Sequence, residues 1–405
     1  MTTHSKKRGP RRLAAVSLAV AGALTLSACG GGGDDSGEAS GSFKLAIVSD
    51  LTGPNAPAGT NVTTGIEAYV HDLNEKGGVD GKKIEILGPF DGQSTPVGTG
   101  TALRSAIAEQ PDAMVGTLAQ TASVKSLLES AKIPTVINSV PDNAWALGDA
   151  VKPWYFAPIA HFGVRFPPGL EEVLGGSLDG KRIAVASLDL APIQLTYRAT
   201  KNLLESKGAT VDEYRTVAID QVSFASEAAA IAGDKPDAVV LGLVGAAPKQ
   251  LVQELTQAGY TGPIINWEPA ASREGVESVG APNYYVQRGT SLDGVEKVIA
   301  PAAKAAGLKI SAQADPSQGW VMGAIAAAGF AGCGEACDDG DFSTSLQSTP
   351  VEAPGVLFGP ITYTDRDHQG TWLVGTYHLN PDSKEVDQVG EPFSATSEDI
   401  IPYLP

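Results

Sequence analysis

Cysteine and histidine are the residue types in this chain best suited to redox or metal chemistry. Cys333 and Cys337 form a single C-x3-C pair, while the five histidines lie far apart in the sequence. A structural zinc site would need a second cysteine pair or histidines at matching spacing. In an exported protein the pair therefore predicts a disulfide that closes a short loop. Metal binding is the less favoured alternative, and we assign no metal ligand.

Motifs typical of hydrolases or nucleotide-binding enzymes do not occur in a fitting context. The segment 175–182 comes near to a phosphate-binding loop, but Arg182 stands where Ser or Thr must hold magnesium, and the segment precedes a strand-like run. His368 lies between acids in a turn-like stretch, which indicates a solvated loop residue, and His71 falls on the surface of a helical pattern. We predict no catalytic residue and no cofactor, although an exported enzyme is not excluded.

Cys29 ends a segment with the composition of an export signal. Five Lys and Arg residues between positions 6 and 12 precede about sixteen mostly apolar residues, fewer than the roughly 20 that span a bilayer. The run Leu26–Cys29 resembles the bacterial lipobox, in which the cysteine becomes the lipidated first residue of the mature protein. We expect a signal peptide at 1–28 and a Gly/Ser-rich tether at 29–42. An ordinary secretory cut near Ala28 and twin-arginine export through Arg11 and Arg12 are the alternatives.

The charge of the chain limits its partners. It has 29 Lys and Arg against 46 Asp and Glu, a net charge of −17, and loss of the five signal cations would leave −22. Such acidity argues against nucleic acid or an anionic lipid surface as a partner. We predict an extracytoplasmic protein that is anchored to the outer face of the cell membrane by its N-terminal lipid.

Short apolar runs alternate with longer amphipathic ones behind the tether. This alternation predicts an α/β fold with parallel sheets and helices on both faces. Glycine after Lys207 and after Ala258 gives two helix stop signals. The strand-like runs are 45–49, 83–87, 113–118, 134–138, 182–187, 238–243 and 263–267, and the helical patterns are 63–75, 98–109, 122–131, 163–174, 195–207, 224–231 and 248–258.

The βα pattern restarts near residue 180, which predicts two doubly wound open-sheet units in series, each of ordinary domain size. The tail has a different character. We expect a helix at 318–330, with Trp320 in the core, and then a hairpin of 359–364 and 371–378 around 365–370.

Several segments resemble the branched-chain amino-acid-binding family, the solute-binding proteins of ABC importers. The first is 44–55, KLAIVSDLTGPN, and the most specific is 67–85, which contains KGGVDGKKIE at 76–85. Further similarity lies at 113–116, 131–134, 237–240 and 359–363, so the resemblance covers nearly all of 43–380. It implies a type I periplasmic binding fold, in which two lobes are joined by a three-crossing hinge and trap solute between them.

Sequence position then suggests the division into lobes. The N-terminal lobe would comprise 43–158 plus 289–360, and the C-terminal lobe 159–288 plus 361–405. Ligands of open parallel sheets bind beyond the carboxyl ends of the strands, so both lobes would present such ends to one cleft.

The resemblance also implies ligand-binding positions. Gln120 and Thr121 stand where the family has serines that bind a carboxylate, near helix N-termini that favour anions. Val140 and Asp142 resemble a backbone contact and a threonine contact. Glu268 matches an acid that pairs with an amino group. Asn55, Pro192 and Trp267 are expected to shape the walls.

This chain departs from the family at some of these positions. Pro57-Ala58 replaces an aromatic residue after the first strand, and Pro192 replaces a tyrosine. Asp142 would repel a ligand carboxylate if it faced the cleft, and it could instead cap a helix that starts near Asn143. A solvated loop acid is the less favoured alternative for Glu268. Leucine itself is therefore in doubt, while an amino-acid-like solute remains the leading class.

The function implied is that of a monomeric, lipid-anchored receptor that binds a small polar organic solute, such as an amino acid or amide, and delivers it to an ABC permease. A ligand-sensing lipoprotein of the same fold, an exported hydrolase and a structural envelope protein are the alternatives. A permease and ATPase encoded beside the gene would favour transport, and turnover of a solute would favour the hydrolase.

Overall fold

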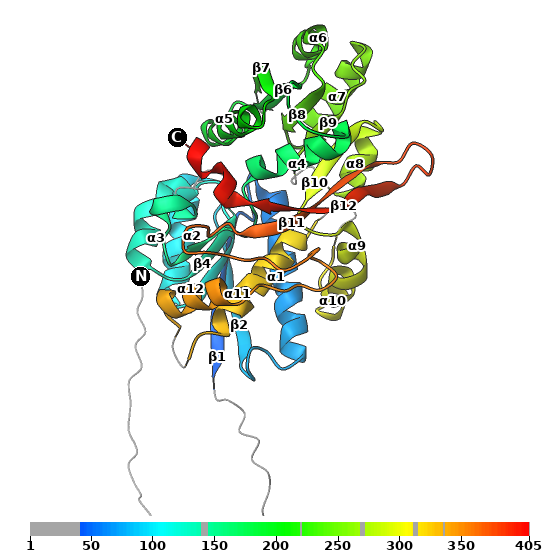
Figure 1. Cartoon of the computed structure of the whole chain (residues 1–405). Helices are drawn as coiled ribbons and strands as arrows, with labels where there is room; N and C mark the ends of the chain where they lie inside the picture. The colour runs from blue at the N-terminus through cyan, green and yellow to red at the C-terminus, as the bar shows by residue number, and fades with distance from the viewer. Residues whose placement is uncertain are drawn as a thin grey trace, which may run out of the picture. The chain divides into compact units, whose positions relative to one another are not determined.

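The first of two sheets is parallel throughout. The structure, a computed structural model, describes residues 41–138, 145–218, 221–267, 272–310, 315–334 and 337–404 (Figure 1). Sheet one has the order β2-β1-β3-β4-β5. The side chains of β3 are buried on both faces, as expected for a parallel sheet covered by helices. Its strands are β1 (Ser42–Ser49), β2 (Lys83–Asp91), β3 (Ala113–Thr117), β4 (Thr135–Asn138) and β5 (Tyr155–Phe156).

The second sheet adds an antiparallel edge to a parallel body. Its order is β12-β11-β10-β9-β8-β6-β7, and only β11 and β12 run antiparallel to their neighbours. The strands are β6 (Arg182–Leu188), β7 (Thr210–Val217), β8 (Ala238–Gly242), β9 (Ile264–Asn266), β10 (Tyr284–Arg288), β11 (Thr371–Leu379) and β12 (Val386–Thr396). Strand order and helix alternation confirm the predicted α/β class with two doubly wound sheets.

Helices follow most of the parallel strands. They are α1 (Ala56–Glu75), α2 (Pro96–Ala108), α3 (Lys125–Ala131), α4 (Phe162–Leu174), α5 (Ala191–Ser206), α6 (Ala225–Asp234), α7 (Ala247–Gln257), α8 (Arg273–Val279), α9 (Leu292–Gly294), α10 (Ala300–Ala305), α11 (Ser317–Phe330) and α12 (Asp339–Ser348). Short 3-10 turns are η1 (Thr121–Val124), η3 (Gly148–Ala150) and η6 (Ser397–Tyr403), and a π-helical turn, η5, spans Val295–Ile299.

Helix α11 returns from far along the chain to pack on α1 (Figure 1). A Cβ at Gly319 would overlap the carbonyl oxygen of Val62, so the two backbones approach as closely as glycine permits. Beside this contact Trp320 meets Tyr69 edge to face at 5.2 Å and is 4% exposed. The predicted core role of Trp320 is therefore confirmed.

The structure corrects several sequence-based elements. Strands β5, β7, β10 and β12 were not predicted, and α1 begins seven residues before the predicted start at Thr63. The early turns of α1 are rich in small and polar residues, so apolar periodicity misses them, while Pro57 fits the first turn of a helix. The predicted hairpin partner of β11 is also wrong, because β11 pairs with β12 and meets the earlier arm only at the Thr362–Thr371 bridge.

His368 is the second correction, because it is buried and not solvated. It is 1% exposed, and its ring stacks on Phe156 at 4.0 Å. Burial lowers the pKa of the imidazole to about 4. A charged flanking sequence indicated a loop, but the turn folds back against sheet one, where His368 donates its backbone N–H to the carbonyl of Ala146 at 2.7 Å.

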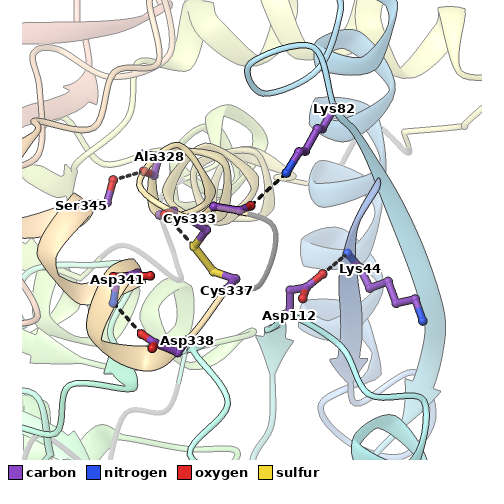
Figure 2. The surroundings of a disulfide bond; sticks show 11 residues. Lys44, Lys82, Asp112, Ala328, Cys333, Cys337, Asp338, Asp341 and Ser345 are labelled. Atoms are coloured by element: carbon purple, nitrogen blue, oxygen red, sulfur yellow. Dashed lines mark hydrogen bonds between the residues drawn. A yellow bond between two sulfur atoms is a disulfide. The ribbon is translucent and has the colours of Figure 1, made fainter. Parts of the chain in front are cut away.

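The two remaining cysteines meet between α11 and α12. The Sγ atoms of Cys333 and Cys337 lie within bonding distance, and their Cα atoms are 4.8 Å apart (Figure 2). Lys82 donates to the carbonyl of Gly334 in the same loop at 2.9 Å. None of the helices among the described residues has the length and apolar character needed to cross a membrane.

Candidate binding site

Both sheets have the same order in their parallel part. β1 lies between β2 and β3 in sheet one, and β6 lies between β7 and β8 in sheet two. The connections that leave two such neighbouring strands diverge to opposite faces, which opens a crevice at their carboxyl ends. We call β1/β3 and β6/β8 the two switch points, and they are the places where this topology holds a ligand.

Asp50 follows β1 directly and is the buried centre of the first switch point. Its side chain is fully buried and joins three loops. Oδ1 accepts the backbone N–H of Ser94 at 3.0 Å, and Oδ2 accepts the N–H of Ala119 at 2.8 Å and the side-chain amide of Asn55 at 3.0 Å. A Cβ at Gly92 would overlap Oδ1 of Asp50, so only glycine allows this close approach.

Asp91 ends β2 and organises the loop after β1. Its Oδ1 accepts the backbone N–H groups of Leu51, Thr52 and Gln93 at 2.8–3.2 Å, and its Oδ2 accepts the hydroxyl of Thr52 at 2.7 Å. Burial acts to raise the pKa of Asp91, but these hydrogen bonds outweigh it and hold the pKa below its usual range. Neither Asp50 nor Asp91 belongs to an ion pair within the described ranges.

The structure brings three predicted site residues to this same switch point. Asn55 is half-buried and bonded to Asp50, and Gln120 is half-buried just after β3. Thr121 is fully buried, and its hydroxyl donates to the carbonyl of Leu118 at 3.1 Å. Thus the side chains of Asn55 and Thr121 already have protein partners.

Neutral hydrogen bonds organise the edge of sheet two. Asn266 is fully buried at the end of β9. Its amide accepts from the N–H of Leu243 at 3.3 Å and donates to the carbonyl of Leu243 at 3.2 Å and to the hydroxyl of Tyr284 at 2.9 Å. Burial raises the pKa of Tyr284, so the phenol stays protonated.

Trp267 lies in the core beneath this edge. It is 3% exposed, and Nε1 donates to the carbonyl of Leu243 at 2.8 Å. Its ring meets Phe162 edge to face at 4.6 Å and Tyr197 at 6.1 Å. The ring therefore has little surface for a solute in this structure, and the predicted wall role draws no support from its placement.

The other predicted positions follow β4, β6 and β9 in the sequence. Pro192 stands in the first turn of α5, directly after β6 and thus at the second switch point. Val140, Asp142 and Glu268 lie outside the described residues, and so does Cys29.

Asp50, Asp91 and Asn266 were missed by the sequence reasoning. Asp50 directly follows the strand-like run 45–49 and Asn266 lies at the end of 263–267, which was the available signal, while Asp91 stands four residues beyond 83–87. Asp and Asn are also common turn residues, so their type alone does not separate a buried organising side chain from a solvated one.

A buried ion pair marks the crossing after β10. Arg288 is fully buried, donates to Asp315, and also reaches the hydroxyls of Thr290 at 2.8 Å and Ser317 at 3.2 Å. Burial acts to raise the pKa of Asp315, but the Arg288 guanidinium outweighs it and holds the pKa below its usual range. The network joins the end of a sheet-two strand to the start of α11, which packs on sheet one.

A second set of contacts lies where the chain enters and leaves sheet two. Asp367 accepts the backbone N–H groups of Gln369, Gly370 and Glu398 at 2.7–3.1 Å. Burial, with a smaller contribution from the charge of Glu398, raises the pKa of Asp367 to about 6. The hydroxyl of Ser397 accepts the N–H of His161 at 2.8 Å and so ties the segment after β5 to the C-terminal segment.

His161 is a cap and not a base. Its Nδ1 accepts the N–H of Gly163 at the start of α4, which leaves the proton on Nε2. Burial, with the charge of Arg165, lowers the pKa of the imidazole to about 3. Among the described residues no group of three or more His, Cys, Asp or Glu side chains could hold a metal ion.

The sequence model of a family described as periplasmic binding protein matches residues 42–380. The chain belongs to this family. Membership confirms the predicted class, a type I periplasmic binding protein and not an enzyme. The paired switch points fit a binding protein, since open α/β sheets bind ligands in the crevice at such points.

Similar proteins with known names include a Leu/Ile/Val-binding protein homolog from Brucella abortus, 37% identical over 67 residues. That match covers 16% of this periplasmic binding protein and 16% of the relative's own length. A branched-chain amino acid ABC transporter protein from Thermus thermophilus with bound valine has a TM-score of 0.73 at 15% identity and covers 89% of this chain and 98% of its own.

Two further solved structures share the fold. A solute-binding protein from R. palustris in complex with benzoate has a TM-score of 0.67 at 20% identity and covers 89% of this chain and 99% of its own. A fatty acid ABC transporter substrate-binding protein from Thermomonospora curvata has a TM-score of 0.66 at 18% identity, with coverage of 90% and 95%. At these identities the likeness establishes the fold.

Proposed function

We propose that this periplasmic binding protein is a lipid-anchored receptor that delivers a small polar organic solute, an amino acid or a related compound, to an ABC import permease. The observation that carries the proposal is the pair of equivalent switch points, one in each sheet, within a chain that belongs to a solute-binding family. Named relatives and solved neighbours include ABC transporter proteins for branched-chain amino acids, which supports an amino-acid-like solute.

The two lobes of the proposal are 43–158 plus 289–360 and 159–288 plus 361–405. The segments after β5, after β10 and before β11 would then be the three crossings. Solute that contacts both lobes stabilises the closed arrangement only through contacts that the open one lacks. Small-angle scattering with and without solute measures this closure, and an unchanged radius of gyration at saturation would contradict it.

The solute would be held from both edges. Glu268 would pair with the amine of the solute, and Gln120 and Thr121 would hold its opposite end. Asn55 and Pro192 would shape the walls of the site. Further predicted contacts are Val140, Asp142 and Trp267. A thermal-shift screen of amino acids, amides, polyamines and small aromatic acids identifies the class, because a ligand of the folded state raises the melting temperature.

Glu268→Gln tests the amine contact. Loss of a charged hydrogen bond weakens binding by roughly 1–3 kcal/mol. Calorimetry with the best amine-bearing solute of the screen measures this loss, and Glu274→Gln on helix α8 is the matched control. Unchanged affinity in Glu268→Gln would remove this residue from the site.

Anchoring would depend on Cys29. A lipidated Cys29 places the mature protein in the membrane fraction and gives an N-terminal peptide with the mass of a diacylglyceryl group. Cys29→Ser should release the protein into the medium or leave the signal uncleaved. A wild-type protein that is cleaved near Ala28 and carries no lipid would contradict the anchor.

The pair Cys333 and Cys337 would be oxidised in the exported protein. A disulfide that closes so short a loop contributes about 2 kcal/mol or less to the free energy of unfolding. Thiol titration under denaturing conditions should find neither cysteine reactive before reduction and both reactive afterwards. Two free thiols in protein isolated from the cell surface would refute the bond.

A further inference from the structure

The first switch point carries an uncompensated buried charge. The carboxylate of Asp50 is fully buried under the loops that follow β1 and β3, and no Lys or Arg pairs with it within the described chain. Its three partners are two backbone N–H groups and the amide of Asn55, which stabilise the charge by hydrogen bonding without neutralising it.

The hydrogen-bond donors at the carboxyl edge of sheet one already bind acceptors within the protein. The N–H of Ala119, in the loop after β3, and the N–H of Ser94, just before α2, both point at Asp50. The hydroxyl of Thr121 donates to the carbonyl of Leu118. Groups that could otherwise bind an anion brought by the solute are thus engaged by an internal anion or an internal carbonyl.

A second carboxylate stands on the neighbouring strand. Asp91 makes four hydrogen bonds to the loops after β1 and β2, at Leu51, Thr52 and Gln93, also without a cation. Moreover, none of the residues that directly follow the parallel strands of the two sheets is Lys or Arg, and two of them, Asp50 and Asp189, are acidic.

We propose that Asp50 and Asp91 make the carboxyl edge of sheet one selective against anionic groups, so that the solute presents a neutral or cationic part there and carries no carboxylate toward this edge. The proposal rests on the proposed function, because it assumes that solute binds at the switch points. It narrows the solute class to compounds that bring no carboxylate to this edge, such as amines and amides.

The expected effect follows from the Coulomb interaction. Two like charges within about 8 Å at an effective dielectric constant near 20 repel strongly enough to change affinity by more than tenfold. The repulsion is weakened by salt only in part, since buried charges are screened less than exposed ones.

The test compares solutes that differ only in the acid group. Calorimetry of the mature chain with leucinamide and leucine, and with benzamide and benzoate, should show the amide binding at least tenfold more tightly in the pair that binds. Equal or tighter binding of the carboxylate would overturn the selectivity and leave the proposed function standing. If neither these four compounds nor any solute of the thermal-shift screen binds, the proposed function is contradicted, and the selectivity with it.

Variants assign the effect to the two carboxylates. Asp50→Asn should raise the affinity for the carboxylate about tenfold relative to the affinity for the amide. Asp91→Asn should also raise the relative affinity for the carboxylate, but by less. If Asp50→Asn fails to fold, Asp91→Asn alone tests whether these carboxylates cause the selectivity. Asp112→Asn is the matched control, because Asp112 binds the N–H of Lys44 at 2.8 Å at the opposite, amino edge of the same sheet (Figure 2). A control that shifts selectivity as much as Asp50→Asn would refute the assignment.

Discussion

The carboxyl edges of the two sheets share a topology but are held by different chemistry. In sheet one, the carboxylates of Asp50 and Asp91 collect backbone N–H groups from the surrounding loops. In sheet two, the amide of Asn266 and the indole of Trp267 bind the backbone of Leu243, and aromatic rings surround them. One edge is organised by charge and hydrogen bonds, the other by neutral bonds and apolar burial.

This difference indicates how each edge responds to a change in conditions. Hydrogen bonds to a carboxylate depend on its ionisation and so on pH. Aromatic packing depends on shape and volume and is indifferent to pH. A solute held between the two edges would meet carboxylates on one side, and on the other a rigid neutral part at β8 and β9 beside Asp189 after β6.

Trp267→Ala should have the largest effect on the free energy of unfolding, and it tests whether aromatic packing holds the edge of sheet two. Removal of a buried indole costs about 3–5 kcal/mol of unfolding free energy, because the cavity cannot fully collapse. Urea denaturation measures this loss. Trp267→Phe is the control, since it keeps most of the packing against Phe162 and loses the bond to Leu243. A cost below about 1 kcal/mol for Trp267→Ala would show that this edge does not depend on the ring.

Asp367→Asn tests how a buried carboxylate that belongs to neither edge makes stability depend on pH. Its folded pKa of about 6 lies above the usual 3.8, so the folded state binds the proton more readily. Stability should therefore fall by up to roughly 3 kcal/mol as the pH rises from 4 to 6. The variant should lack this slope.

Unfolding free energies at pH 4.5 and pH 7 measure the difference between wild type and Asp367→Asn. Asp365→Asn, on the exposed part of the same turn, is the control and should keep the wild-type slope. An identical pH dependence in wild type and Asp367→Asn would contradict the raised pKa.

Asp91→Asn should have the smallest effect and lower the free energy of unfolding by about 1 kcal/mol at pH 7, because the amide retains one acceptor oxygen. The folded pKa of Asp91 is lowered, so its stabilisation is present above about pH 4 and is lost as the pH falls below that value. Melting temperatures of wild type and variant should converge between pH 5 and pH 3. Asp149→Asn, on an exposed side chain, should show no such convergence.

The sequence alone determined the class of the fold and the positions of most parallel strands. The stretches Leu45–Val48 and Ile183–Ala186 within the predicted runs are apolar without interruption, as strands buried on both faces must be, and two of the helices carry clear stop signals. The segment 67–85 carried the resemblance to the family, which the match over 42–380 confirmed. These features depend on local composition and spacing, which a sequence states directly.

Only the tertiary structure decided which polar residues organise the switch points. Asp50 becomes a buried centre because Ser94 and Ala119, 44 and 69 residues away, turn their N–H groups toward it. Trp267 becomes core because Phe162 comes back from α4, and His368 is buried because its turn folds onto Phe156. Burial of a polar or aromatic side chain is the sum of contacts from distant segments, and no local pattern encodes that sum.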